Sequence, residues 1–446
     1  MDNQLAYIDQ ASFLGLRALG HSPQEQFCWI YDRPIDIEAL RRTHANLGNT
    51  LLGRLIERSP LPFGRHRWVA APHQADLDVA PAPRPREDML AWFDEQIHVP
   101  IDPETGPAWR MAVLPFTDGG GAVTLIVSHS VADGAGAMMS LAAAVHGHNM
   151  NLGYPAPRSR PTIAALREDI RAIATAVPEM AKAVSAAVKL GREEAGGPKS
   201  QATAVTPAVD SSPGAGTLTT LPTVAAYVDA DVWDAHAASL GGTSNSLVAG
   251  VATLLGKARG RIEPDGLVTL NFPVSERTLT DTRANALTAM TITGDPDEVR
   301  TTLTGLRTSV RQGFKSLAKE SNKLIAPLPL IPLTSQRLLR RLEGMTQGAG
   351  KTVGCSNLGE IPDDVSRVDG GDADSFWARG VEWPVTRADL DRTGGSLMVA
   401  SIRMSGTVLV FAQAWQAGGP NTKDILAGQF DQALKDMGVT TATLVY

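Results

Sequence analysis

The stretch Leu125-Ile126-Val127-Ser128-His129-Ser130-Val131-Ala132-Asp133-Gly134 joins the most apolar run of the chain to its clearest chemical signal. Residues 123–127 are almost all apolar or β-branched, which predicts a central strand covered on both faces. His129 follows this strand directly, and a helix is expected from Asp133. The imidazole is therefore presented at the end of a sheet, where the chain turns, and His129 is the first candidate for a functional residue.

The spacing of a histidine, an acid four residues later and a glycine is weak by itself. Nine histidines and 47 acids among 446 residues place an acid at any fixed distance from a histidine about once by chance, and the glycine reduces this to ~0.1. The position after the strand adds the specificity. A neutral imidazole there can accept the proton of a hydroxyl or amine that attacks an acyl carbonyl, with no acyl-enzyme. The alternative is a core histidine bonded to the backbone.

Working outward, apolar periodicity alternates between helix and strand. In the first part of the chain it predicts strands at residues 27–31, 109–115 and 122–128, with a turn at 118–121. A helix is expected after Asp36, which is a suitable N-cap. Later in the chain we expect a helix opened by a cap at Thr243 or Ser244, and strands near residues 224–228, 267–272, 396–403 and 408–415. Mixed strands and helices in both parts predict an α/β fold with two layered halves.

The composition changes between residues 193 and 222, where Gly, Pro, Ser, Thr and Ala replace large apolar residues. Such a composition is typical of a flexible connection. We therefore expect an N-terminal subdomain at residues 1–192, a linker at 193–222 and a C-terminal subdomain at 223–446.

Charge and cysteine content exclude several classes of function. The net charge of −6 gives no basic excess for binding nucleic acid. Two cysteines, Cys28 and Cys355, can form one disulfide at most and cannot complete a four-ligand zinc site, so a reducing compartment is the simplest setting. The N-terminal residues lack a secretory signal pattern, and no uninterrupted apolar run reaches the ~20 residues of a membrane helix. We expect a cytoplasmic protein, at most peripheral on a membrane.

Competing motifs are poorer. The run at residues 348–352 resembles the end of a phosphate-binding loop, but the first glycine of that motif is missing and a strand is expected next. Cys355 reads as a buried thiol and not as a nucleophile. His146 and His148 lack a third metal ligand at a suitable spacing, so no metal site is expected. The Pro-rich residues 324–333 fit either a loop over the core or a wall over an acyl chain.

The His129 stretch resembles the H-H-x-x-x-D-G motif of the superfamily that contains chloramphenicol acetyltransferase and condensation domains. Within it, the chain most resembles the polyketide-associated acyltransferases and the bacterial wax ester synthase/diacylglycerol acyltransferases. Other segments look like this superfamily in the same order along most of the chain, namely residues 7–14, 106–110 and 271–277, Asn285 and residues 356–359.

The resemblance implies two chloramphenicol acetyltransferase-like subdomains with mixed sheets and an active-site tunnel between them. It makes His129 and Asp133 the catalytic pair of the motif, with His129 as the base and Asp133 in an orienting role through an ion pair with Arg277. Gly134 and Arg277 would position the loop. Candidates for lining the tunnel or polarising the acyl carbonyl are Asn285, Ser356, Asn357 and Ser128.

One position departs from the family pattern, because Ser128 stands where the first histidine is expected. The second histidine is the base in this family, so Ser128 bears only on the shape of the loop. The implied function is an O-acyltransferase that moves an acyl group from acyl-CoA or an acyl carrier protein to a hydroxyl of a lipid or polyketide-like acceptor. No metal or redox cofactor is implied; the thioester is a co-substrate. The alternatives are an amide-forming condensation-type enzyme and a non-catalytic scaffold of the same fold.

Overall fold

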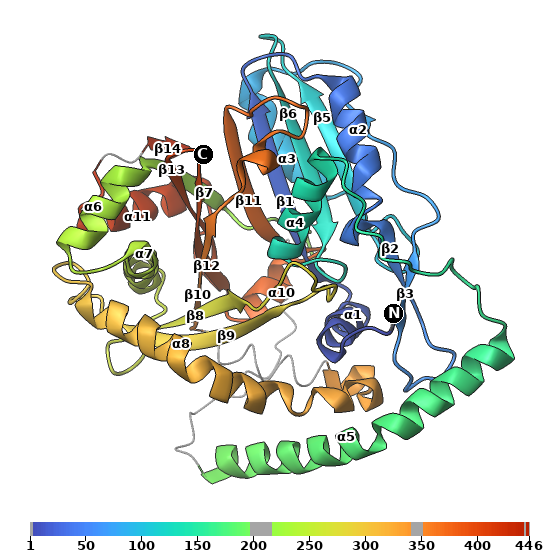
Figure 1. Cartoon of the computed structure of the whole chain (residues 1–446). Helices are drawn as coiled ribbons and strands as arrows, with labels where there is room; N and C mark the ends of the chain where they lie inside the picture. The colour runs from blue at the N-terminus through green and yellow to red at the C-terminus, as the bar shows by residue number, and fades with distance from the viewer. Residues whose placement is uncertain (1–2, 197–215, 340–350, 441–442, 446) are drawn as a thin grey trace.

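Two α/β halves make up the computed structural model, each built around its own mixed β-sheet (Figure 1). The structure describes residues 3–196, 216–339, 351–440 and 443–445. The predicted α/β class is confirmed. None of the helices in this described part of the chain combines the length and apolar character that crossing a membrane requires.

The first sheet has five strands with β1 and β6 at its centre. In spatial order they are β11 (Ser375–Trp383), β1 (Ser22–Tyr31), β6 (Gly121–Ser128), β5 (Trp109–Pro115) and β4 (Asp78–Val79). Every residue of β6 is buried, as its continuous apolar run predicts, and β5 pairs with it antiparallel through the expected turn. The strand predicted at residues 27–31 begins earlier, because β1 pairs with β6 and β11 over its whole length.

The described N-terminal part of the chain, up to residue 196, contains five α-helices: α1 (Tyr7–Leu19), α2 (Ile37–Leu47), α3 (Met89–Ile97), α4 (Gly134–Val145) and α5 (Thr162–Gly196). Asp36 caps α2 as predicted, since its carboxylate accepts a hydrogen bond from the backbone N–H of Ala39 at 2.9 Å. A two-stranded sheet of β2 (Arg54–Glu57) and β3 (Arg67–Ala70) lies beside α1. Short 3₁₀ turns are η1 (Leu51–Gly53) and η2 (Arg86–Asp88).

The second sheet has seven strands, and β10 within it runs parallel to both of its neighbours. In spatial order the strands are β14 (Thr443–Val445), β7 (Thr223–Asp229), β13 (Thr407–Trp415), β12 (Ser396–Met404), β10 (Val353–Glu360), β8 (Val268–Ser275) and β9 (Leu287–Gly294). The strands predicted in this half are present. Its helices and turns are α6 (Ala230–Ser239), α7 (Ser244–Ala258), α8 (Thr304–Ile325), η3 (Leu328–Leu333), η4 (Asp363–Ser366), α10 (Arg387–Arg392) and α11 (Lys423–Asp436).

Helix α7 forms the centre of the second core, because residues 246–256 are all buried against the sheet and α11. Thr243 is its N-cap, and Thr243 and Ser246 form a reciprocal capping box. Of the two caps that the sequence left open, the structure therefore has Thr243.

The connection between the halves differs in part from the expected linker at residues 193–222. Helix α5 continues to Gly196, so the first four residues of that segment are helical, and residues 197–215 lie outside the described part of the chain. Strand β11 crosses back from the second half and pairs with β1 at the edge of the first sheet. The first sheet is thus completed by a strand from far along the chain.

Candidate active site

His129 lies at the end of β6, where the backbone turns sharply toward α4. The Ser128 carbonyl accepts hydrogen bonds from the backbone N–H groups of Val131 (2.9 Å) and Ala132 (3.3 Å), while the His129 N–H donates to the Pro23 carbonyl on β1 (3.1 Å). Ser128 itself is buried, and its hydroxyl accepts a hydrogen bond from the Ser130 N–H. These bonds fix the loop and hold the His129 side chain in a largely buried position, 17% exposed.

Asn285 holds one nitrogen of the His129 ring. Its Oδ1 atom lies 2.7 Å from His129 Nδ1, and its Nδ2 atom faces two acceptors, Asp9 Oδ1 and the His129 carbonyl, each at 3.3 Å. Because the amide nitrogen donates to those acceptors, Oδ1 must accept from Nδ1. The proton of a neutral imidazole is therefore on Nδ1, and Nε2 keeps a free lone pair.

Asp9 supports Asn285 from α1. Its carboxylate accepts hydrogen bonds from the backbone N–H groups of Ala284 (2.9 Å) and Asn285 (2.8 Å). Burial raises the pKa of Asp9, and this effect outweighs the opposing effects of the Ala284 and Asn285 hydrogen bonds and the Arg54 charge. Sequence reasoning did not assign Asp9 a role, although it lies in the N-terminal segment that resembles the family. The sequence feature that could have pointed to Asp9 is an acid on the apolar face of the helix, on the same side as Phe13.

Asp133 and Arg277 form a buried ion pair. Arg277 Nη2 lies 2.9 Å from Asp133 Oδ1, and the two side chains are only 5% and 4% exposed. The same carboxylate accepts the N–H of Gly136 at the start of α4 and that of Ala286 in the loop after β8. The contact between Asp133 and Arg277 that the family resemblance implied is therefore present, and it joins α4 to the loop that carries Asn285.

The guanidinium of Arg277 also holds the loop between β8 and β9. Its Nη1 donates to the carbonyls of Asp281 (3.2 Å) and Arg283 (3.0 Å), and its Nη2 donates to the carbonyl of Ala284 (2.9 Å). A glycine at position 136 makes room for this group, because a Cβ there would lie 3.1 Å from Arg277 Cζ. A Cβ at this position would require Arg277 or Asp133 to move by a few tenths of an ångström.

Glu25, on β1, faces the other ring nitrogen of His129. Its Oε1 atom lies 3.4 Å from Nε2, and both side chains are about one-fifth exposed. Burial lowers the pKa of His129, but Glu25, Asp133 and Asn285 together outweigh burial, so the pKa lies above its ordinary value. Gly134 lies beside this carboxylate, since a Cβ there would be 3.9 Å from Glu25 Oε1.

The sequence analysis missed Glu25 because its predicted strand began at residue 27. Phe27 and Trp29 point into the core from β1, and period-2 alternation places Glu25 on the same face. An acid at the buried face of a strand was therefore the signal that could have found it.

A scan against family models and a search of curated proteins both found no match. Among solved structures, the first condensation domain of the CDA synthetase is similar at 15% identity, with a TM-score of 0.57 over 100% of this chain and 99% of that one. Polyketide synthase associated protein 5 from Mycobacterium tuberculosis is similar at 16% identity, with a TM-score of 0.51 over 98% and 96%.

The chain has the condensation-domain fold. A third similar structure is the starter condensation domain of rhizomide synthetase RzmA, at 15% identity and a TM-score of 0.50, covering 98% of this chain and 96% of that one. The fold expected from the sequence, two subdomains with mixed sheets, is thereby confirmed.

Within the condensation-domain fold, the structure gathers most of the residues singled out from the sequence. His129, Asp133, Gly134, Arg277 and Asn285 meet where the loop after β6 contacts the loop after β8. Asn285 lies on the Nδ1 side of His129, where its amide is occupied by the hydrogen bonds described above.

Ser356 and Asn357 lie on β10 of the second sheet. Ser356 is buried. The Asn357 amide nitrogen donates to Asn245 Oδ1, and its oxygen accepts from the Gly359 N–H at 2.9 Å. Their contacts are thus within the second half.

The cysteines and the histidine pair that the sequence analysis weighed against His129 lie outside the candidate site. Cys28 and Cys355 are free and buried on different sheets, and burial raises the pKa of both thiols. His146 pairs with Asp364 at 2.9 Å and stacks on His148, and no group of three or more metal-ligating side chains occurs in the described residues.

The phosphate-loop candidate at residues 348–352 begins outside the described part of the chain. The segment that follows it is β10, as predicted. The Pro-rich segment at residues 324–333 forms the end of α8 and the turn η3, which packs against α1 and α5.

Proposed function

We propose that the chain is an acyltransferase that moves an acyl group from a thioester, on CoA or a carrier protein, to a hydroxyl of a lipid or polyketide-like acceptor. The observation that carries this proposal is the His129 ring, whose Nδ1 is held by Asn285 and whose Nε2 faces Glu25. The tunnel between the two subdomains that would admit donor and acceptor is part of the proposal.

In the proposed reaction, His129 Nε2 accepts the proton of the acceptor hydroxyl as its oxygen attacks the thioester carbonyl. A tetrahedral intermediate forms and collapses, the carbon–sulfur bond breaks, and the imidazolium returns its proton to the departing thiolate. The negative charge of Glu25 stabilises the imidazolium while it exists, because it lies 3.4 Å from Nε2. The products are an ester and a free thiol, and no acyl-enzyme and no metal or redox cofactor enters this scheme.

Glu25 also favours a second candidate function, the formation of an amide. A carboxylate beside the base would attract a cationic acceptor, and a protonated amine carries that charge whereas an alcohol does not. His129 would then remove one proton of the ammonium before attack and pass it to the departing thiolate as the carbon–sulfur bond breaks. It would next accept a second proton from the former amine nitrogen and release that proton to solvent. The two candidates differ only in the acceptor.

Thiol release from a panel of acyl-CoAs and acyl carrier proteins tests both candidates, with long-chain alcohols or amines added. An ester product and alcohol-dependent thiol release would support the first candidate, and an amide product with amine dependence would support the second. Release of no thiol with any donor and acceptor would contradict both and favour a non-catalytic scaffold.

Replacing Glu25 with glutamine is expected to move the acid limb of the pH–rate profile to lower pH. His129 must be neutral to accept a proton, so turnover falls as the pH drops through the pKa of His129. In the wild type this pKa is above its ordinary value, and of the groups that raise it Glu25 has the largest effect. Loss of the carboxylate lowers that pKa. Initial rates measured from about pH 5 to about pH 9, in steps of roughly one pH unit on either side of the ordinary pKa of histidine, give the size of the shift.

Glu382→Gln is the matched control, because Glu382 also contacts a histidine, His21, at 2.6 Å but on β11. The pH–rate profile of Glu382→Gln should coincide with that of the wild type. An acid limb that stays in place in Glu25→Gln would contradict the assignment of Glu25.

A further inference from the structure

Helix α5 carries a stripe of exposed apolar residues beside its buried side. The helix is 35 residues long and runs along the outer edge of the molecule (Figure 1). Its inward side includes Ala165, Asp169 and Ala183, which are buried, and Ile173 and Met180, which are half-buried. The flank next to them bears residues that are 38% to 68% exposed, which we call the α5 stripe: Ile163, Leu166, Ile170, Val177, Val184 and Val188.

The spacing of the α5 stripe places its members on one face, because they are separated by three, four or seven residues. An amphipathic helix in a globular protein normally turns its large apolar residues to the core and its small or polar residues to water. Helix α5 turns Ile173 and Met180 inward, but the large apolar residues of the α5 stripe stay exposed beside them. A continuous apolar face of this kind marks an interaction surface.

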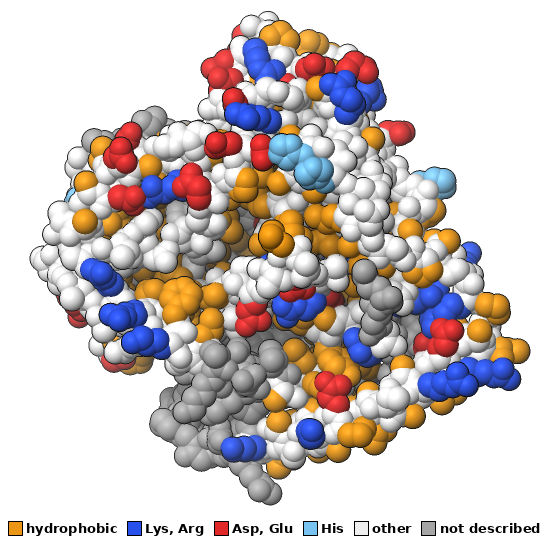
Figure 2. Space-filling model, viewed as in Figure 1, with side chains coloured by type: hydrophobic (Ala, Val, Ile, Leu, Met, Phe, Trp, Pro, Cys, Tyr) orange, Lys and Arg blue, Asp and Glu red, His pale blue; other side chains and the backbone are white. Residues whose placement is uncertain are grey.

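Basic side chains border the α5 stripe along one flank. Arg167, Arg171, Lys182 and Lys189 are all exposed, and at ~100° per residue they fall together on one side of the stripe. None of the four has an ion-pair partner among the residues that the structure describes. Figure 2 shows hydrophobic and basic side chains side by side along the lower right edge, over α5.

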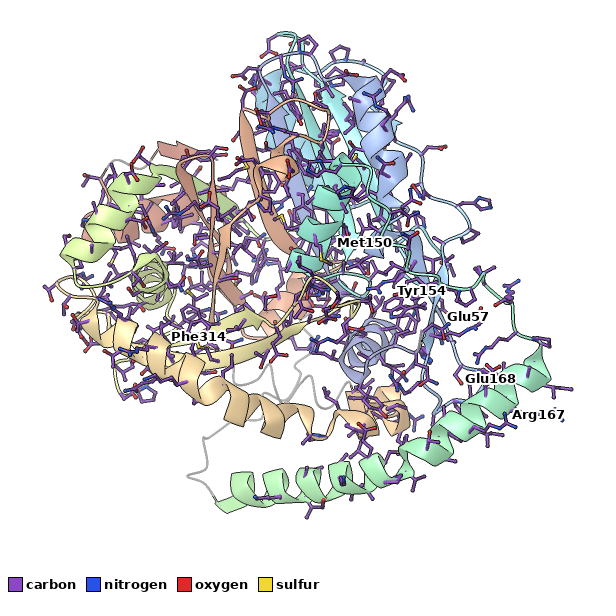
Figure 3. The ribbon with its side chains drawn as sticks, viewed as in Figure 1. Glu57, Met150, Tyr154, Arg167, Glu168 and Phe314 are labelled. Carbon is purple, nitrogen blue, oxygen red and sulfur yellow. The ribbon has the colours of Figure 1, made fainter. Side chains whose placement is uncertain are left out.

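Among the α5 residues whose side chains the structure describes, the acidic ones contact other parts of the chain. Glu168 pairs with Arg160 at 2.8 Å, and Glu179 accepts a hydrogen bond from the Tyr7 hydroxyl at 3.1 Å. In Figure 3, Glu168 lies on the side of α5 toward the body and Arg167 on the outer side. The α5 stripe therefore has a positive border on its outward flank.

We infer that the α5 stripe docks on an anionic lipid bilayer, with the helix lying in the plane of the interface. Apolar side chains on one face and Arg or Lys beside them are the features of interfacial helices, in which the cations reach the headgroups while their stems stay in the apolar region. A second copy of the chain fits less well, because it would bring two rows of cations together.

Vesicle flotation with the full chain tests this inference, with phosphatidylglycerol vesicles against phosphatidylcholine vesicles at two salt concentrations. The wild type should float with the anionic vesicles, and less at high salt. The double variant Ile170→Glu, Val177→Glu should bind at least about tenfold more weakly, because two carboxylates would enter the interface. Both sites are exposed, so the fold is expected to be retained.

Two further variants sharpen the test. Val99→Glu with Val232→Glu alters two exposed valines outside α5 and should bind like the wild type. Replacing the four flanking cations with serine should lower binding to anionic vesicles by about tenfold or more and flatten its salt dependence. Circular dichroism of each variant checks that it is folded.

The inference would be overturned if the wild type bound neither kind of vesicle, or if the stripe variant bound as well as the wild type. It would also be overturned by a lipid-free dimer in analytical ultracentrifugation that Ile170→Glu with Val177→Glu dissolves, which would assign the stripe to a second copy. Because no acyl donor or acceptor is present, these results do not depend on the proposed acyl transfer.

Discussion

Replacing His129 with alanine is expected to lower turnover by ~10² to 10⁴ while leaving the fold in place, because general-base catalysis contributes that much. The ring is held by Asn285 and faces Glu25, so its loss removes the Nε2 atom that accepts the proton of the acceptor in the proposed reaction. Single-turnover rates of thiol release at saturating donor measure the effect. His129→Gln, which keeps a polar side chain of similar reach, should be nearly as slow.

His146→Ala is the matched control for this loss, since His146 is half exposed and pairs with Asp364 at the C-terminal end of α4. Its turnover should equal that of the wild type. If His129→Ala and His129→Gln both turned over at the wild-type rate with unchanged melting temperatures, His129 would not be the base.

Asp133→Ala and Arg277→Ala should each lower both stability and turnover. Breaking a buried pair leaves the other charge without its partner, a change that costs about 3–5 kcal/mol in free energy of unfolding. The pair is only 5% and 4% exposed, and it also anchors the start of α4 and the loop that carries Asn285. Thermal melting and initial rates measure the two effects.

The double variant should cost clearly less than the sum of the two single variants, because residues in direct contact are not additive. A double-mutant cycle by melting and by rate gives the coupling. Strictly additive losses would show that Asp133 does not act through Arg277. Arg300→Ala, at an exposed pair with Asp436, serves as a control in which about 0–1 kcal/mol is expected.

The strand, the turn and the histidine could be predicted because each depends on neighbouring residues. The apolar run of β6 required burial on both faces, and His129 and Asp133 follow it within five residues. The cap Asp36 and the segment of β10 are local in the same sense. Local patterns therefore located the centre of the site.

The partners of His129 could not be derived in the same way, because they come from distant parts of the chain. Asp9, Glu25 and Asn285 are brought to the imidazole by α1, β1 and the loop after β8, and no periodicity in sequence relates these elements. Only the family resemblance pointed to the pairing of Asp133 with Arg277. Glu25 had no such guide, and its position depends on the register of β1 against β6.

Strand β11 has a consequence for the order in which the molecule can be assembled. β1 pairs with β11 across more than three hundred residues, for example Phe27 with Ala378. Contacts so distant in sequence slow folding, since a long loop must close before they form. During synthesis, one edge of β1 stays open until residues 375–383 have emerged, and an open edge beside apolar side chains such as Phe27 and Trp29 can pair with another chain. The N-terminal half alone would keep that open edge, because the strand that covers it comes from residues 375–383.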